Sequence, residues 1–236
     1  MEFKEKLKKL QPVLGTWVIS PSVNSLEAIC SAEIDFVILD QEHGSISLNQ
    51  LPDIFRSLEL GNTLPLVRIS DSQAKECKQV LDAGAGGIIV PMVESAEQLE
   101  FIKDSSRWPP SGRRGVGFSR ANLFGKNFED YSDEAQQPIL VAMIESIKAV
   151  ENLESILQVE GLDAILIGPY DLSASMGITT QFSDKKFIDL INNICLLSDQ
   201  YSVSYGIHQV TPSQKELLNK IEEGFRFIAY SIDSFF

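Results

Sequence analysis

The stretch FVILDQEHG, residues 36–44, decides the fold class, because a short apolar run passes directly into titratable side chains. An uninterrupted apolar run of this length is typical of a strand buried on both faces of a parallel sheet. Such strands ordinarily end in Gly, Asn or Pro. Here Asp40, Glu42 and His43 follow instead, and they form either a solvated loop or a functional site.

The same unit, an apolar strand followed by a helical stretch, repeats along the chain. Eight strands are predicted, at residues 13–19, 36–40, 65–69, 87–91, 138–145, 163–168, 203–208 and 225–232. Helical periodicity separates them, at residues 25–33, 48–60, 73–84, 95–105, 146–159, 184–200 and 211–224. Eight parallel strands close into a (β/α)₈ barrel, typically one domain of about 250 residues. The alternative, a doubly wound open sheet, lacks its GxGxxG after the first strand. We therefore predict an α/β fold with a single (β/α)₈ TIM barrel over residues 1–236.

Local signals refine this prediction. Ser95 with Gln98 indicates a capping box, and Thr211-Pro212 indicates a cap followed by proline in the first helical turn. The excursion at about 105–137 is predicted to be a long loop, which in a compact domain is usually functional or mobile. The last strand is followed only by a few residues, so we expect the final helix of the barrel to be absent or truncated.

Composition limits the partners and the compartment. The formal charge is 20 − 33 = −13, which makes a nucleic acid or an anionic membrane an unsuitable partner. There is no long apolar run and no signal-peptide core, so we expect no membrane association and no secretion. The three cysteines, Cys30, Cys77 and Cys195, have no metal-binding spacing and predict free thiols in a reducing cytoplasm.

In a (β/α)₈ barrel, the site is built where several strands end at their carboxyl side. Arg68 lies inside a predicted strand, and an unpaired buried guanidinium is costly. It must either pair with a carboxylate or hold an anionic ligand, and we favour the ligand. Glu145 and Asp171 follow neighbouring strands. They either cap helices or converge on a hard divalent ion such as Mg²⁺ or Mn²⁺, which takes oxygen ligands.

Three further side chains border this predicted site. His43 shares its strand end with two acids, which favours an acid/base role over a structural one. Asp82, near the end of the third predicted helix, is a candidate acid partner for it. His208 is treated as structural or peripheral, and Trp17 as a wall of the pocket.

Several motifs occur together in the order of a known family. They are EHG (42–44), PLVR (65–68), LDAGAGGIIVPMV (81–93), WPPSGRRGVG (108–117), IES (144–146) and IGPYDLSASMG (167–177). In these the chain resembles the HpcH/HpaI family of metal-dependent class II pyruvate aldolases, which includes 4-hydroxy-2-oxoheptanedioate and 2-keto-3-deoxy acid aldolases. The resemblance covers roughly residues 13–177.

The resemblance implies a cofactor and a reaction. A divalent ion, Mg²⁺ or Mn²⁺ with Co²⁺ as a further candidate, would be held by Glu145 and Asp171. Pyruvate would chelate that ion through its carboxylate and keto oxygens, and Arg68 would stabilise the enolate oxygen. The reaction would form or cleave a 2-oxo-4-hydroxy acid from pyruvate and an aldehyde, in a homo-oligomer.

The resemblance also assigns the remaining roles. His43 with Asp82 would be the acid/base, while Asp40 and Glu42 would hold the residues that contact the substrate and the ion in place. The backbone around the segment formed by Gly168, Pro169, Tyr170 and Asp171 would receive the substrate carboxylate. Two substitutions depart from the family pattern: Tyr170 stands for a small residue, and Ser146 for a frequent Thr. Family members also continue into a final helix that is exchanged between subunits.

Three other functions are alternatives to this reaction. An acyl-CoA ester lyase of the same superfamily needs cations for the CoA phosphates, and Arg113, Arg114 and Arg120 are the candidates. A phosphosugar enzyme needs Gly-rich turns after the last two strands, which are missing here. A non-catalytic, metabolite-binding barrel remains a third alternative, although it would have no reason to keep the acids, arginine and histidine together.

Overall fold

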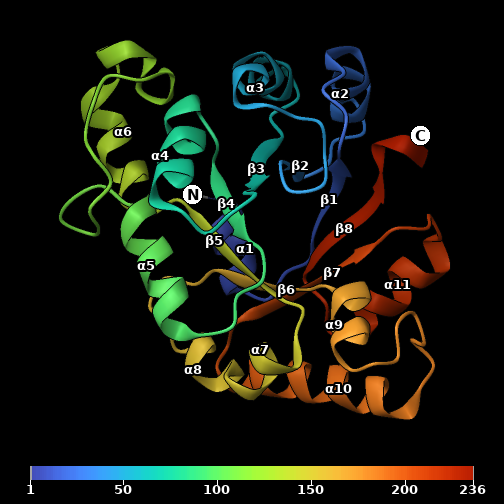
Figure 1. The fold of residues 1–236 in the computed structure, drawn as a ribbon. Helices are drawn as coiled ribbons and strands as arrows, with labels where there is room; N and C mark the ends of the chain where they lie inside the picture. The colour runs from blue at the N-terminus through green and yellow to red at the C-terminus, as the bar shows by residue number, and fades with distance from the viewer. Residues whose placement is uncertain (1, 236) are drawn as a thin grey trace.

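The computed structural model describes residues 2–235. Eight parallel strands form one closed barrel in the order of the chain, each paired with the next and β8 paired with β1 (Figure 1). The strands are β1 (Val13–Val18), β2 (Phe36–Asp40), β3 (Leu64–Arg68), β4 (Gly87–Val90), β5 (Ile139–Ile144), β6 (Ala164–Ile167), β7 (Ser204–Gln209) and β8 (Phe227–Ile232). The predicted (β/α)₈ barrel and all of its strands are therefore confirmed.

The helices surround the strands (Figure 1). The α-helices are α1 (Glu2–Lys8), α2 (Val23–Cys30), α3 (Leu51–Leu60), α4 (Ala74–Ala83), α5 (Ala96–Ser106), α6 (Phe128–Ala135), α7 (Ile147–Glu151), α8 (Leu153–Leu157), α9 (Pro169–Ser175), α10 (Lys185–Gln200) and α11 (Gln214–Glu222). Three 3₁₀ helices complete the set, η1 (Leu48–Gln50), η2 (Arg120–Gly125) and η3 (Asp233–Phe235). Among residues 2–235, no helix is both long and apolar enough to cross a membrane.

The strands alternate between two apolar layers. In β2, Phe36 and Ile38 face the inside of the barrel, whereas Val37 and Leu39 pack against the outer helices. Because successive strand residues point to opposite faces, the next inward position is Asp40. The same period places Arg68 after Leu66, and Glu145 after Met143, on the inner face. Strand geometry thus directs these polar side chains to the carboxyl end of the barrel interior.

Helix α1 closes the opposite end of the barrel, a role that the sequence did not indicate. Phe36 and Phe227 stack there with ring centroids 4.5 Å apart, and Phe3 of α1 meets both rings edge-on. The Ser204 hydroxyl donates a hydrogen bond of 2.8 Å to the Leu7 carbonyl. The interior is therefore a packed core that is open only where the strands end.

The excursion at 105–137 is not a continuous loop. It contains η2 and α6, and the Trp108 N–H donates to the Ala135 carbonyl at 2.8 Å, which joins its two ends. Burial of Trp108 against Phe128 and Tyr131 explains the local order. The prediction of a long loop is correct only for residues 107–119.

Three further details differ from the predictions. Helix α11 is capped by Ser213, whose side chain accepts from the Glu216 N–H, so Thr211-Pro212 precedes the cap. The Ser95 hydroxyl does accept a hydrogen bond from the Gln98 N–H. The side-chain oxygen of Gln98, however, accepts from the N–H of Glu94 and not from that of Ser95, as a capping box would require. The predicted helix at 146–159 is two short helices, α7 and α8, with Asn152 between them.

After β8, the described chain continues only into η3, beside α2 (Figure 1). Asp233 accepts hydrogen bonds from the N–H groups of Ile19 and Ser20, at 3.2 and 2.9 Å, and so ties the end of β8 to the end of β1. An apolar groove of about 560 Å³ lies on the outer face of β1 and β8 against α2. In the part of the chain that the structure describes, η3 is the last helical element.

Candidate active site

A cavity of about 310 Å³ opens at the carboxyl ends of the strands. Every strand except β4 contributes to its wall, either directly or through the residues that follow it. The lining residues are Trp17, Ile19, Asp40, His43, Arg68, Met143, Glu145, Leu166, Ile167, Gly168, Pro169, Tyr170, Asp171, His208, Val210 and Ile232. All but two of the predicted site residues are in this set; Glu42 stands just behind it and Asp82 lies elsewhere.

Arg68 is held between two carboxylates, which explains how a guanidinium is buried to 7 % exposure inside a strand. Its Nε donates to Asp40 Oδ1 at 2.9 Å, and its Nη2 donates to Asp40 Oδ2. Its Nη1 lies 2.8 Å from Glu42 Oε2. These contacts use three of the five N–H donors of the guanidinium. Arg68 is therefore paired structurally and still borders the cavity, so the two sequence alternatives are compatible.

Asp40 organises the end of β2. Besides Arg68, it accepts hydrogen bonds from Trp17 Nε1 at 3.0 Å and from the N–H groups of Glu42 and His43 at 3.0 and 3.2 Å. Burial alone would raise the pKa of Asp40, but the hydrogen bonds and charge of Arg68 lower it below its ordinary value, with help from Trp17. Asp40 therefore stays anionic and orients Arg68, Trp17 and the EHG turn together.

Glu145 is the buried carboxylate of the cavity, with 3 % exposure. The Met92 N–H donates to Oε1 at 2.6 Å, from a backbone held at a φ of 47°. A Cβ on residue 168 would lie 2.6 Å from Oε2, so only glycine leaves room for this carboxylate. The pKa of Glu145 is raised to about 7, mainly by burial; the charges of Asp171 and Glu42 act in the same direction, and the Met92 N–H and Arg68 oppose them.

Asp171 lies in the first turn of α9 at the mouth of the cavity. Within residues 2–235, its side chain makes no hydrogen bond, although an acid at this position also suits the positive end of a helix. Glu145, in contrast, is not a helix cap: Ser146 caps α7 by accepting from the Ala149 N–H at 3.1 Å. The capping alternative therefore does not apply to Glu145.

The two carboxylates fit a divalent cation. No cluster of three or more His, Cys, Asp or Glu side chains with metal-binding geometry occurs among residues 2–235, so the protein would supply two ligands and leave other positions open. Magnesium and manganese commonly bind through one or two carboxylates together with water or substrate oxygens. Burial, and then the charges of Asp171 and Glu42, raise the pKa of Glu145, and a bound cation would favour its ionised form.

The structure does not bring His43 and Asp82 together within the chain. The His43 side chain is 68 % exposed, and its Nε2 is 3.9 Å from Glu42 Oε2. Asp82 pairs instead with Lys78 at 3.7 Å and lines a different hollow along α4. Helix α4 runs back from the strand ends, so Asp82 lies roughly 12 Å further along its axis than Ala74. Within this one chain, Glu42 rather than Asp82 is the carboxylate beside His43, and the role of Asp82 stays a prediction.

His208 was treated as structural or peripheral, and it forms part of the cavity wall. Its ring stacks on Trp17 with centroids 4.6 Å apart and planes 12° apart, and Arg68 lies 4.8 Å from the same Trp17 ring. Strand period was the signal that could have found it, because Ser204, Gly206 and His208 share the inner face of β7. Met92 was also missed, since a backbone N–H leaves no mark in the sequence.

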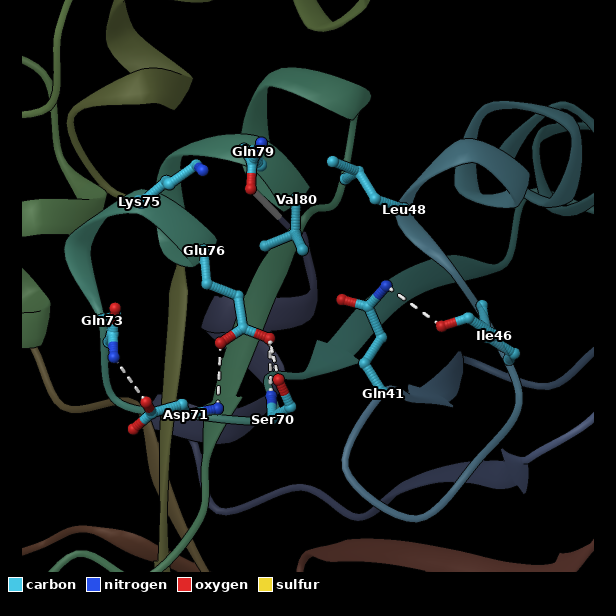
Figure 2. A pocket seen from close by; sticks show the side chains of 10 residues that line it. All are labelled: Gln41, Ile46, Leu48, Ser70, Asp71, Gln73, Lys75, Glu76, Gln79 and Val80. Atoms are coloured by element: carbon cyan, nitrogen blue, oxygen red, sulfur yellow. Dashed lines mark hydrogen bonds between the residues drawn. The ribbon is translucent and has the colours of Figure 1, made fainter.

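A second hollow of about 430 Å³ lies between the end of β3 and α4, and Figure 2 shows its side chains. There the Glu76 carboxylate points at the loop after Arg68 and accepts from Ser70 N and Oγ at 2.7 Å and from Asp71 N at 2.9 Å (Figure 2). Its polar groups largely bond to one another. This hollow therefore stabilises the loop that follows Arg68, and it contains neither Glu145 nor Asp171.

The arginines of the 105–137 excursion are engaged outside the cavity. Arg113 pairs with Asp104 at 3.1 Å, and Arg120 pairs with Glu59 at 2.7 Å. Arg114 is buried and donates to the Tyr131 hydroxyl at 2.9 Å. Since none of them lines the cavity, they do not form the cationic surface that a CoA-ester lyase would need.

This arrangement defines a (β/α)₈ barrel with an acidic cavity at its strand ends and one arginine set between two carboxylates. The family model of HpcH/HpaI aldolase/citrate lyase matches residues 14–236, and the chain belongs to this family. It is 32 % identical over 235 residues to a hydroxypyruvate/pyruvate aldolase of Roseobacter denitrificans, covering 98 % of this chain and 90 % of the relative.

Two further comparisons agree with this family membership. The chain is 34 % identical over 238 residues to a 4-hydroxy-2-oxovalerate aldolase of Novosphingobium aromaticivorans, covering 99 % of this chain and 88 % of the relative. Among solved structures, an HpcH/HpaI aldolase/citrate lyase family protein from Burkholderia cenocepacia superposes with a TM-score of 0.92 at 26 % identity, covering 99 % of this chain and 93 % of that one. The family resemblance of the sequence is confirmed and extends through the whole barrel.

Proposed function

We propose that the protein is a class II, divalent-metal-dependent aldolase, a carbon–carbon lyase that forms or cleaves a 2-oxo-4-hydroxy acid from pyruvate and an aldehyde. The observation that carries this proposal is the buried Glu145 carboxylate, whose pKa is raised to about 7 and which shares one cavity with Asp171 and Arg68. The aldolase names of its relatives support the same reaction class.

Glu145 and Asp171 would hold the ion, which we propose to be Mg²⁺ or Mn²⁺, with Co²⁺ as a further candidate. When bound, it would polarise the keto group of pyruvate and stabilise negative charge on the enolate oxygen. Gly168 leaves the space in which the Glu145 carboxylate stands. Two oxygen ligands suit a hard cation that retains water or substrate oxygens in its remaining positions.

Arg68 would bind the keto oxygen that becomes the enolate oxygen. Its contacts with Asp40 and Glu42 leave two N–H donors for a ligand and prevent the guanidinium from rotating. Donors that are oriented before the reaction stabilise developing charge without reorganisation. Trp17 would contribute the wall on which the guanidinium rests.

His43 would move the proton at the aldehyde oxygen. In condensation it would give a proton to that oxygen as the new C–C bond forms, and in cleavage it would take the proton back. Within this chain, Glu42 is the carboxylate beside it, with Oε2 3.9 Å from Nε2. The backbone amides of Tyr170 and Asp171, in the α9 turn that begins with Gly168 and Pro169, would bind the pyruvate carboxylate.

We further propose a homo-oligomer in a reducing cytoplasm. Four large apolar side chains within ten residues of the excursion are exposed, namely Val116, Phe118, Leu123 and Phe124, and contact with another subunit would bury them. All three cysteines are free thiols. Light scattering after size-exclusion chromatography would test the assembly, and a monomer at micromolar concentration would contradict it.

Exchange of pyruvate methyl protons with deuterium tests the proposed function without knowledge of the aldehyde. We expect exchange with Mn²⁺ or Mg²⁺, and none after EDTA treatment. Glu145→Gln should abolish it, whereas Glu151→Gln, on the exposed face of α7, should behave as the wild type. Equal exchange in EDTA would contradict the metal-dependent mechanism. No exchange by folded, metal-loaded protein would favour a non-catalytic barrel.

A further inference from the structure

The turn between β4 and α5 carries the backbone N–H that orients Glu145. Met92 donates to Glu145 Oε1 at 2.6 Å from a φ of 47°, a left-handed backbone conformation that residues other than glycine rarely adopt. Such a conformation persists only where surrounding contacts hold it. The Met92 side chain is 45 % exposed, so its own packing within the chain does not supply them. Contacts with the backbone of the turn must therefore fix this N–H in place.

The side-chain amide of Gln98 makes these contacts. Its Nε2 donates to the Met92 carbonyl at 3.2 Å, and its Oε1 accepts from the Glu94 N–H at 2.9 Å. One planar group thus holds the turn at two backbone positions. Gln98 lies in the first turn of α5, where its own N–H donates to the Ser95 hydroxyl at 3.3 Å. The turn is therefore fixed to a helix and not to another loop.

The same turn is also tied to the segment that follows Glu145. Ser146 Oγ donates to Glu94 Oε1 at 3.0 Å, and Lys148 Nζ lies 3.0 Å from Glu94 Oε2. Asn152 Nδ2 donates to the Glu94 carbonyl at 2.8 Å. These contacts hold the Glu94 end of the turn. Of the side chains that hold the turn, only that of Gln98 also reaches Met92.

We propose that Gln98 is a positioning residue for the cation site: by fixing the Met92 turn, it keeps the Met92 N–H on Glu145 and so sets the orientation in which this carboxylate meets the ion. This inference rests on the metal role proposed for Glu145. Gln98 does not line the cavity, so it would act through the backbone and not by touching ion or substrate. Replacing a group that orients a metal ligand commonly weakens metal binding by roughly 10- to 100-fold.

The amide signal of Met92 tests the inference in the metal-free protein. The chain has four methionines, so labelling with ¹⁵N-methionine gives few amide resonances, and Met92→Leu identifies the one from residue 92. Gln98→Leu removes both contacts without adding a methionine. The Met92 proton should then move upfield and exchange with solvent about tenfold faster, the effect of losing one hydrogen bond. The Met143 and Met176 amides should not change, and Gln79→Leu, at an exposed position of α4, should behave as the wild type.

Calorimetric titration of the full chain with Mn²⁺ gives the second measurement. Gln98→Leu should bind Mn²⁺ about tenfold more weakly, as expected for a group behind a metal ligand. Ser72→Ala removes the third contact of the Gln98 amide, which does not involve the turn, and should leave the affinity unchanged. Gln98→Glu keeps the acceptor for the Glu94 N–H, so its Met92 amide exchange should lie between those of wild type and Gln98→Leu.

Two results would overturn the inference. One is an unchanged Met92 resonance in folded Gln98→Leu, even if Mn²⁺ binding falls, because the loss would then come from general destabilisation. The other is an unchanged Mn²⁺ affinity in a variant whose Met92 resonance has moved. A wild-type protein that binds no Mn²⁺ would instead show that the proposed metal site is wrong, and the inference would fall with it.

Discussion

Replacing Glu145 with Gln tests the central electrostatic feature of the site in the metal-free protein. Burial raises the pKa of this carboxyl from its ordinary 4.5 to about 7. The folded protein therefore binds a proton more tightly than the unfolded chain. Between pH 4.5 and 7 the free energy of unfolding should fall as pH rises, because the native state holds more protons than the unfolded state.

The size of the effect follows from the shift. Moving a carboxyl pKa from 4.5 to about 7 corresponds to about 3 kcal/mol, fully expressed above pH 7. Gln keeps the shape and can still accept from the Met92 N–H, but it has no charge to desolvate. Metal-free Glu145→Gln should therefore be more stable than the wild type at pH 8 by about 3 kcal/mol and equal to it near pH 4.5. In a protein of this size, that is roughly 6 to 12 °C in melting temperature.

The assay is urea unfolding at several pH values between 4.5 and 8, in EDTA and in excess Mn²⁺. The difference between the two proteins is the quantity of interest, since other groups titrate in both. Mn²⁺ should stabilise only the wild type, because the variant lacks a ligand. Glu151→Gln, at an exposed position of α7, is the matched control and should show no such difference. If Glu145→Gln followed the wild-type curve at every pH, the carboxylate would not be an unbalanced buried charge.

The remaining predictions concern the neighbours of this carboxylate. Gly168→Ala would place a Cβ 2.6 Å from Glu145 Oε2, so Mn²⁺ affinity measured by calorimetry should fall at least tenfold; unchanged affinity would show that the carboxylate can move aside. Arg68→Lys would lose the bidentate contact with Asp40, and pyruvate proton exchange should slow by about 10²- to 10³-fold. An unchanged exchange rate would contradict the role proposed for Arg68. Trp17→Phe would remove the indole N–H that donates a hydrogen bond to Asp40, so the free energy of unfolding measured with denaturant should fall by about 1 kcal/mol. An unchanged free energy of unfolding would mean that water replaces this hydrogen bond.

The order of the strands and much of the site were predictable because they depend on local pattern. Apolar runs such as residues 36–40 identify strands from their own composition, and eight of them imply closure. Alternation along a strand then places Asp40, Arg68 and Glu145 on the inner face. These residues were expected at the site because they lie at or near the carboxyl ends of predicted strands, and the structure brings all three to one cavity.

Other features depend on which segments meet after closure. The sequence could not show that α1 covers the barrel floor, that Met92 orients Glu145, or that His208 rests on Trp17. Nor could it show that, within one chain, α4 carries Asp82 away from His43 and leaves Glu42 beside that ring.

The amino-acid sequence by itself determined the eightfold strand pattern, the family and the inventory of acids, arginine and histidines at the strand ends. The tertiary structure alone decided their partners: which carboxylates hold Arg68, which glycine makes room for Glu145, and which backbone N–H orients it. The physical reason is that strand periodicity is set by neighbours in sequence. Hydrogen bonds across a closed barrel instead join residues as distant as Ile19 and Asp233, and only the packed fold sets their geometry.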